Sequence, residues 1–138
     1  MATTEDGWAC IGLKGQELAL KATGSADHAY PGGAYPAVLR LDAGELQLSR
    51  KCHVYGVPSF CRDVEALYQS LAGRAALATT DDLKVSLEGD GAGNVSVRVE
   101  AGDVTATIYR LNARFVVDQT FLPPFIRGLT SAFPDVAR

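Results

Sequence analysis

The sequence predicts an α+β domain in which an antiparallel sheet of about six to eight strands, built from hairpins, is packed on one face by two helices. Over most of the chain, apolar residues alternate with other residues, which indicates strands with one buried face. Two segments, about 58–72 and 120–133, instead carry apolar residues three or four positions apart, which is the spacing of an amphipathic helix. The 138 residues show no internal repeat and no second domain, so we predict a single domain, residues 1–138.

Two hairpins are predicted before the first helix. Residues 8–23 alternate on both sides of a turn at 14–16, and residues 37–50 alternate on both sides of a turn at 42–45. Between the hairpins, residues 24–36 (GSADHAYPGGAYP) follow neither period and are rich in glycine and proline, so we predict a long loop there.

The first helix is predicted between Pro58 and Gly73. The Ser59 hydroxyl is placed to cap its N-terminus, and Gly73 can end the helix because glycine adopts a positive φ at little cost. The apolar stripe of this helix consists of Phe60, Val64, Leu67 and Leu71. A helix with one apolar face is expected to lie on a sheet.

Further strands are predicted after the first helix. Residues 74–79 are small and apolar, and residues 83–88 and 95–99 alternate on both sides of a turn. That turn, EGDGAGN, is interpreted as a hairpin turn, since it lacks the lysine and the following helix of a phosphate-binding loop. In the next strand the apolar positions change from even to odd after Ile108, so we predict a bulge or short break near Asn112.

The segment FVVDQTFLPPFI, residues 115–126, joins the last strand to the last helix. Asp118, Gln119 and Thr120 interrupt its apolar sequence, and we interpret them as a structural junction. Asp118 and Thr120 can accept hydrogen bonds from backbone N–H groups that would otherwise be buried without a partner. Thr120 is the predicted N-cap, and the alternative is that the regular helix begins at Pro123.

Composition limits the classes of function. A net charge of −3, without a cluster of lysines and arginines, argues against nucleic-acid binding. No apolar stretch is long enough to cross a membrane and the N-terminus opens with acidic residues, so we expect no membrane insertion, no secretory signal and a cytoplasmic location. Cys10, Cys52 and Cys61 are an odd number at irregular spacing and are expected to be reduced thiols.

Catalytic and metal-binding motifs are missing from the sequence. His28 lies in the predicted loop and His53 at a strand end, and neither is near a nucleophile signature. Cys52, His53 and Cys61 could supply three ligands, but their spacing matches no common zinc pattern. We therefore predict no catalytic residue, no metal and no cofactor. An enzyme would need His28 or His53 to converge with a cysteine or a carboxylate.

Loop tyrosines and turn carboxylates are the candidate partner-binding residues. Tyr30 and Tyr35 are expected in an exposed loop, where a tyrosine can bury a large contact area at a small cost in side-chain entropy. They could instead fold back over a sheet edge. The acidic candidates lie in predicted turns and are Asp81, Asp82, Asp90 and Asp103. Turns also favour such residues for backbone reasons alone.

Three segments in the second half of the chain carry a family resemblance. They are FCRDVEALYQSLAGRAAL (60–77), LKVSLEGDGAGNVSVRVE (83–100) and RFVVDQTFLPPFIRGL (114–129). Together they resemble the WapI-type immunity protein family of bacterial polymorphic-toxin systems, which act in contact-dependent competition. In that family a helix ending in a Leu-x-Gly step precedes a strand pair with a Gly-x-Gly-like turn. A strand ending in Asp-Gln-Thr/Ser-aromatic-Leu-Pro then leads into the C-terminal helix, and DQTFLP is the sharpest part of the match.

The resemblance implies a small, non-enzymatic, cytoplasmic protein that binds and neutralises a cognate toxin domain. Neutralisation by occlusion of the toxin surface would draw its affinity from the acidic turns and the loop tyrosines. The alternative is a small-molecule or peptide-binding module that uses the sheet face not covered by helices. A concave apolar pocket with a few convergent polar groups would favour that alternative.

Overall fold

The computed structural model of the chain describes residues 7–13, 15–25, 27, 33–79, 83–102 and 110–133. Within these residues the chain forms eight strands, two α-helices and one short 3-10 helix. The strands are β1 (Ala9–Leu13), β2 (Gln16–Ala22), β3 (Ala34–Ala43), β4 (Leu46–Tyr55), β5 (Ala72–Thr79), β6 (Leu83–Asp90), β7 (Asn94–Gly102) and β8 (Arg110–Asp118). The helices are α1 (Val57–Ser70), η1 (Gln119–Phe121) and α2 (Leu122–Ala132).

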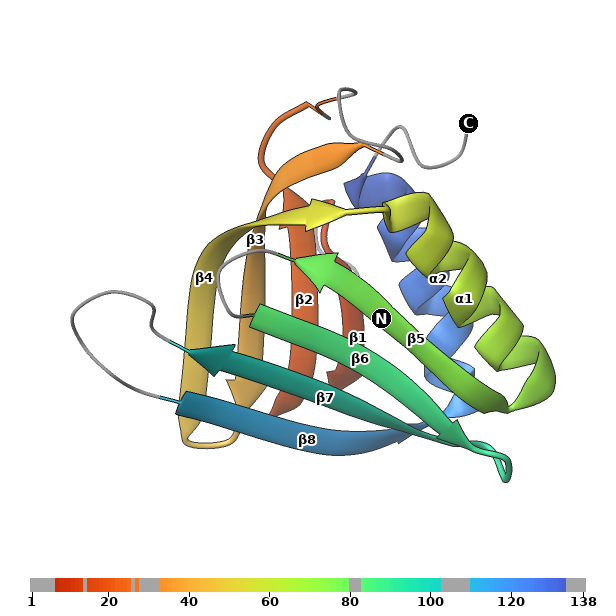
Figure 1. The fold of residues 1–138 in the computed structure, drawn as a ribbon. Helices are drawn as coiled ribbons and strands as arrows, with labels where there is room; N and C mark the ends of the chain where they lie inside the picture. The colour runs from red at the N-terminus through yellow and green to blue at the C-terminus, as the bar shows by residue number, and fades with distance from the viewer. Residues whose placement is uncertain are drawn as a thin grey trace.

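The strands form one antiparallel sheet in which each strand pairs with the next along the chain. The pairing between β4 and β5 is short and joins only Val54 to Thr79 and Tyr55 to Ala78. The sheet therefore consists of two four-stranded halves, β1–β4 and β5–β8, which run in clearly different directions (Figure 1). Strands β1 and β8 are the two edges.

The two helices lie side by side at one end of the sheet (Figure 1). Helix α1 connects the two halves and packs against β5, whereas α2 follows β8 and packs against β1 and α1. The predicted class, an antiparallel α+β fold with two helices, is confirmed. In the part of the chain that the structure describes, no helix is long and apolar enough to cross a membrane.

Both halves of the sheet and both helices contribute to one hydrophobic core. Alternate residues of the strands point into it, among them Leu20, Leu39, Val85 and Val97. The helices add the rings of Phe60 and Phe125, which meet edge to face with their centroids 6.3 Å apart. This period-two burial explains why the hairpins could be predicted from the sequence.

The ends of α1 differ from the prediction. The N-cap is Gly56, with a φ of 62°, and among the described residues no side chain caps the helix, so the predicted Ser59 cap is wrong. The C-cap is Leu71, which also has a φ of 62°, and Gly73 lies in β5 instead of ending the helix. A backbone hydrogen bond from Gly91 to the Leu71 carbonyl, 2.8 Å long, holds this end of α1 on the β6–β7 turn.

Strand β8 has no bulge at Asn112. Its pairing with β7 is unbroken, and Asn112 lies opposite Glu100 in the regular register. The odd-numbered residues Ala113, Phe115 and Val117 are buried, as the alternation predicted. The even-numbered apolar positions Val104, Ala106 and Ile108 lie outside the described part of the chain.

The junction between β8 and α2 is capped by Asp118, which corrects the prediction that Thr120 is the N-cap. The Thr120 backbone N–H donates a 2.8 Å hydrogen bond to Asp118 Oδ1, and the Thr120 hydroxyl donates to the same oxygen. Helix α2 begins at Leu122, so Pro123 and Pro124 occupy its first turn. Prolines are tolerated there because those amides have no intrahelical acceptor.

Candidate functional site

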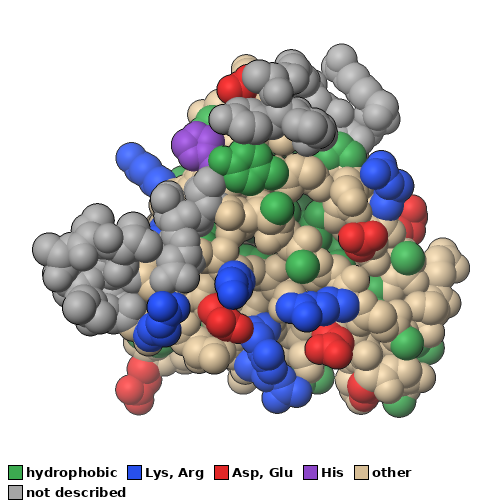
Figure 2. Space-filling model, in the orientation of Figure 1, with side chains coloured by type: hydrophobic (Ala, Val, Ile, Leu, Met, Phe, Trp, Pro, Cys, Tyr) green, Lys and Arg blue, Asp and Glu red, His purple; other side chains and the backbone are tan. Residues whose placement is uncertain are grey.

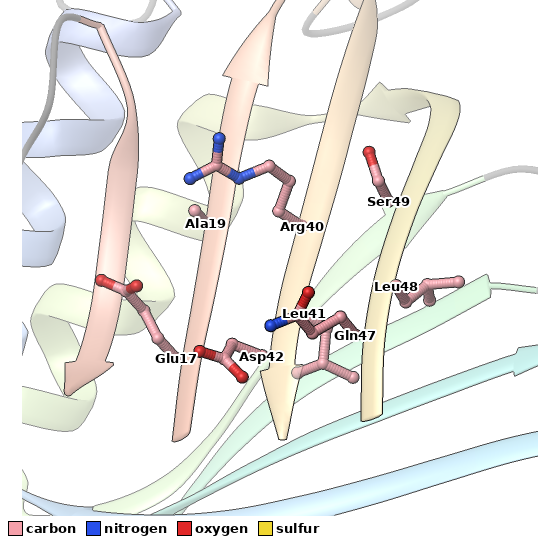
Figure 3. A pocket seen from close by; sticks show the side chains of 8 residues that line it. All are labelled: Glu17, Ala19, Arg40, Leu41, Asp42, Gln47, Leu48 and Ser49. Carbon is pink, nitrogen blue, oxygen red and sulfur yellow. The ribbon is translucent and has the colours of Figure 1, made fainter. Parts of the chain in front are cut away.

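A hollow of about 520 Å³ lies on the outer face of β2, β3 and β4, which is the face turned away from the core (Figure 3). We call it the polar hollow. Its lining residues are Glu17, Ala19, Arg40, Leu41, Asp42, Gln47, Leu48 and Ser49.

Strand alternation brings the polar side chains to this face. In β3, Leu39 and Leu41 are buried in the core, so Arg40 and Asp42, which alternate with them, point outward. The strand register then forms two neighbouring rows across the three strands, one of Ala19, Arg40 and Ser49 and one of Glu17, Asp42 and Gln47. Side chains at directly opposite positions are close enough to interact.

Arg40 is stacked on an aromatic ring. Its guanidinium carbon lies 4.3 Å from the centroid of the Trp8 ring, and the ammonium group of Lys21 lies 5.7 Å from the same centroid. Figure 3 shows the Arg40 side chain reaching over Ala19, whose methyl group is almost inaccessible to solvent. A cation–π contact of this kind restricts the orientation of the guanidinium.

Carboxylates lie in the other row of the polar hollow. Glu17 and Asp42 are directly opposite each other on β2 and β3. Asp42 Oδ2 accepts a 3.2 Å hydrogen bond from the Gly15 N–H, and the Gly15 carbonyl accepts a 2.7 Å hydrogen bond from Gly44. These bonds join the β1–β2 turn to the β3–β4 turn and fix the position of Asp42.

The polar hollow combines charged and neutral polar side chains. A stacked cation occupies one row, two carboxylates occupy the other, and an amide and a hydroxyl extend the two rows. Such a surface can donate and accept several hydrogen bonds at once. Among the described residues there is no group of three or more His, Cys, Asp or Glu that could hold a metal ion.

Tyr35 is not a loop residue, and its prediction as an exposed contact residue is wrong. It lies in β3, is only 2% exposed, and packs its ring edge to face against Phe133 with the centroids 5.0 Å apart. The sequence contained the signal for this, because Tyr35 is in phase with the buried Ala37 and Leu39. Tyr30, the other predicted contact residue, lies outside the described residues.

Asp90 shapes the β6–β7 turn. Its carboxylate accepts hydrogen bonds from the backbone of Ala92 (2.7 Å) and Asn94 (3.2 Å) and from the Asn94 side chain (3.1 Å). These bonds, that from Ala92 most of all, lower the pKa of Asp90. The side chain is exposed, so its turn role and the predicted partner contact remain compatible. Asp81, Asp82 and Asp103 lie outside the described residues.

The described thiols and imidazole do not form a site together. Cys52 and His53 are neighbours in β4 and therefore point to opposite faces, Cys52 into the core and His53 outward. Burial, and to a smaller extent the Glu65 carboxylate, raise the pKa of the Cys61 thiol to about 11 against the opposing effect of Arg62. A thiol with that pKa stays protonated at neutral pH and is a poor nucleophile. His28 lies outside the described residues.

Gln119 completes the predicted junction as a structural residue. Its backbone N–H donates a 2.8 Å hydrogen bond to the Gly93 carbonyl and so continues the β7–β8 ladder. Its side-chain oxygen is buried and has no hydrogen-bond partner among the described residues. Together with the Asp118 cap, this supports the interpretation of the junction as structural.

The residues that build the polar hollow were not singled out from the sequence. Their only local signal is that Arg40 and Asp42 alternate with buried leucines, which holds for many solvated strand faces. The contact between Trp8 and Arg40 depends on two successive strand pairings and cannot be seen in a local window. Comparisons of the chain with protein-family models, with curated proteins and with solved structures found no match.

Proposed function

We propose that this chain is a non-enzymatic, cytoplasmic immunity protein that binds and neutralises a cognate bacterial toxin domain, with the polar hollow as its contact surface. The observation that carries the proposal is the Trp8–Arg40 stack at the polar hollow. Tryptophan and arginine are among the residues most enriched where alanine substitution costs the most binding energy in protein interfaces. The resemblance of DQTFLP and its flanking segments to the WapI-type family supports immunity as the purpose of binding.

The character of the polar hollow favours a protein partner over a small molecule. Small-ligand sites are concave and lined mainly by apolar and aromatic side chains. Here Arg40, Asp42, Gln47 and Ser49 provide charged and polar groups on the face of a sheet. Polar and charged groups spread over a sheet face match the polar rim and hydrogen bonding of a protein interface. The alternative of a small-molecule-binding module is therefore less well supported.

The stack also reduces the entropic cost of binding. A free arginine side chain loses rotamer freedom when an interface immobilises it, and this loss opposes association. Arg40 is already held against Trp8 in the unbound protein. A partner surface that presents both hydrogen-bond acceptors and donors would complement the mixed charges of the polar hollow. The charged ends would also fix the orientation in which the partner binds.

Co-expression tests the proposal. Any toxin domain that is encoded immediately upstream of this chain is expressed alone and together with it, and growth is compared. Restored growth with a stable complex is the expected result. Titration calorimetry of the purified complex then compares Arg40→Ala with Arg62→Ala, an exposed arginine on α1. Arg40→Ala should weaken binding about 30-fold, the effect of losing roughly 2 kcal/mol at an interface hot spot, and Arg62→Ala should bind like the natural protein.

Two outcomes would contradict the proposal at different points. Failure to restore growth, with no complex formed, would argue against an immunity role. Restored growth with equal affinities for the natural protein and Arg40→Ala would retain the role but remove the polar hollow from the interface. The melting temperatures of both variants serve to exclude loss of folding as the cause.

A further inference from the structure

Three arginines from three different strands surround a second hollow, on the outer face of β5–β8. This hollow of about 100 Å³ is lined by Arg74, Ser86, Glu88, Ser96, Arg98 and Arg114. We call it the arginine hollow. Figure 2 shows lysine and arginine side chains gathered over this half of the sheet, with acidic side chains between them.

The strand register places two of the arginines directly against each other. Arg98 on β7 lies directly opposite Arg114 on β8, and like charges in directly opposite positions of a sheet are destabilising. Arg74 has a more favourable position, opposite Glu88. A repulsive arginine pair on an exposed sheet face is understandable if a bound anion separates the two charges.

The donors of these arginines are largely uncommitted. Arg114 Nη2 donates a 3.0 Å hydrogen bond to Ser96 Oγ, which holds its guanidinium beside the hollow. No hydrogen bond or ion pair to Arg74 or Arg98 is present among the residues that the structure describes. The Ser86 and Ser96 hydroxyls, which also line the hollow, can act as neutral hydrogen-bond donors.

Charge and size indicate which anion fits. Three guanidinium groups and one carboxylate leave the arginine hollow with a net charge of about +2, and a phosphate group carries about −1.5 to −2 at neutral pH. The volume is about three times the roughly 30 Å³ that one molecule occupies in liquid water. That volume accommodates one phosphate group, and the remainder of an ester would lie outside the hollow in solvent. Arginine also binds the oxygens of phosphate in pairs, through its planar fork of N–H groups.

We propose that the arginine hollow binds a single phosphate group, either free phosphate or the phosphate of an ester. Arg98 and Arg114 hold the phosphate from opposite sides, and Arg74 adds a third positive charge. The negative charge of Glu88 lowers the affinity for phosphate. This site lies on the other half of the sheet from the polar hollow and does not depend on the function proposed above.

Titration calorimetry of the full chain at constant ionic strength tests the proposal with three probes: inorganic phosphate, O-phosphoserine and acetate. We expect saturable binding of phosphate and much weaker binding of acetate. Affinity should fall as the pH drops below about 6, because phosphate loses its second charge there. Equal or tighter binding of O-phosphoserine would identify an ester as the ligand, and binding of inorganic phosphate alone would identify the free anion.

Variants of the lining residues give effects of opposite sign. Arg98→Gln and Arg114→Gln should each weaken phosphate binding about tenfold, the effect of losing one charge-assisted hydrogen-bonding group. Glu88→Gln should tighten it, because it removes the one negative charge of the site. Arg62→Gln on α1 is the matched control and should leave the affinity unchanged. Arg98→Gln relieves a repulsion, so this variant is expected to fold, which its melting temperature verifies.

The proposal is overturned if neither phosphate probe binds saturably, or if acetate binds as tightly as phosphate. It is also overturned if Arg98→Gln and Arg62→Gln bind phosphate equally well. Binding of Arg98→Gln to the toxin domain distinguishes this proposal from the immunity function proposed above. The variant should lose phosphate affinity but bind the toxin domain as tightly as the natural protein does.

Discussion

The ring of Phe115, in edge strand β8, lies against the backbone of Gly12, in edge strand β1. A methyl group at position 12 would lie 3.0 Å from Phe115 Cε1 and only 2.1 Å from the Gln16 carbonyl oxygen. Gly12 also has a φ of 108°, a conformation that residues with a side chain rarely adopt. The two edges of the sheet can approach each other here because position 12 has no side chain.

Replacement of Gly12 by alanine should therefore destabilise the protein. We expect a loss of about 3 kcal/mol in the free energy of unfolding, from backbone strain and from the close contact with Gln16. Urea unfolding measures it. Gly15→Ala is the matched control, since Gly15 has a φ of 94° but nothing within 4 Å of an added methyl group. Equal losses in the two variants would show that only the backbone conformation matters.

Asp118→Ala should lower the melting temperature by a few degrees, and Thr120→Ala should lower it less. Asp118 accepts both hydrogen bonds of the junction, whereas loss of the Thr120 hydroxyl leaves the backbone bond in place. Thermal unfolding followed by circular dichroism compares the variants. A larger effect of Thr120→Ala would identify Thr120 as the cap after all.

Stability should fall in acid partly because of Asp90. Hydrogen bonds from the turn lower its pKa in the folded protein below the ordinary value of 3.8. Its contribution is therefore complete above that value and is lost as the pH falls through the lowered pKa. The natural protein should be more stable than Asp90→Asn at neutral pH, and the difference should shrink below about pH 4. Urea unfolding at several pH values measures it, and a constant difference would exclude this linkage.

Tyr35→Ala should destabilise the protein as a core substitution does, by about 3 kcal/mol or more. The ring is buried against Phe133, so its loss leaves a cavity. Tyr68→Ala on α1, where the side chain is 37% exposed, is the control and should cost much less. If Tyr35→Ala had the same free energy of unfolding as the natural protein but no longer bound the toxin domain, the interpretation of Tyr35 as an exposed contact residue would be restored.

Most strands and both helices could be predicted because burial in this fold follows a local period. Leu39 and Leu41, two positions apart, point to the same face whatever the rest of the chain does. The boundaries that were missed depend on contacts from distant parts of the chain. Leu71 holds a left-handed conformation at the end of α1 while its carbonyl accepts a hydrogen bond from Gly91. A rule for helix termini that considers only residues 58–73 cannot include Gly91.

By itself the sequence determined which face of most strands and helices enters the core, since the helix and strand periods follow from backbone geometry alone. Only the tertiary structure decided which outward side chains meet. Trp8 reaches Arg40 through the pairing of β1 with β2 and β2 with β3, and Arg98 faces Arg114 through the register of β7 with β8. Strand register is set by turns and by core packing across strands. The exposed residues that form the two hollows do not influence that register, so their own sequence does not reveal which residues become their neighbours.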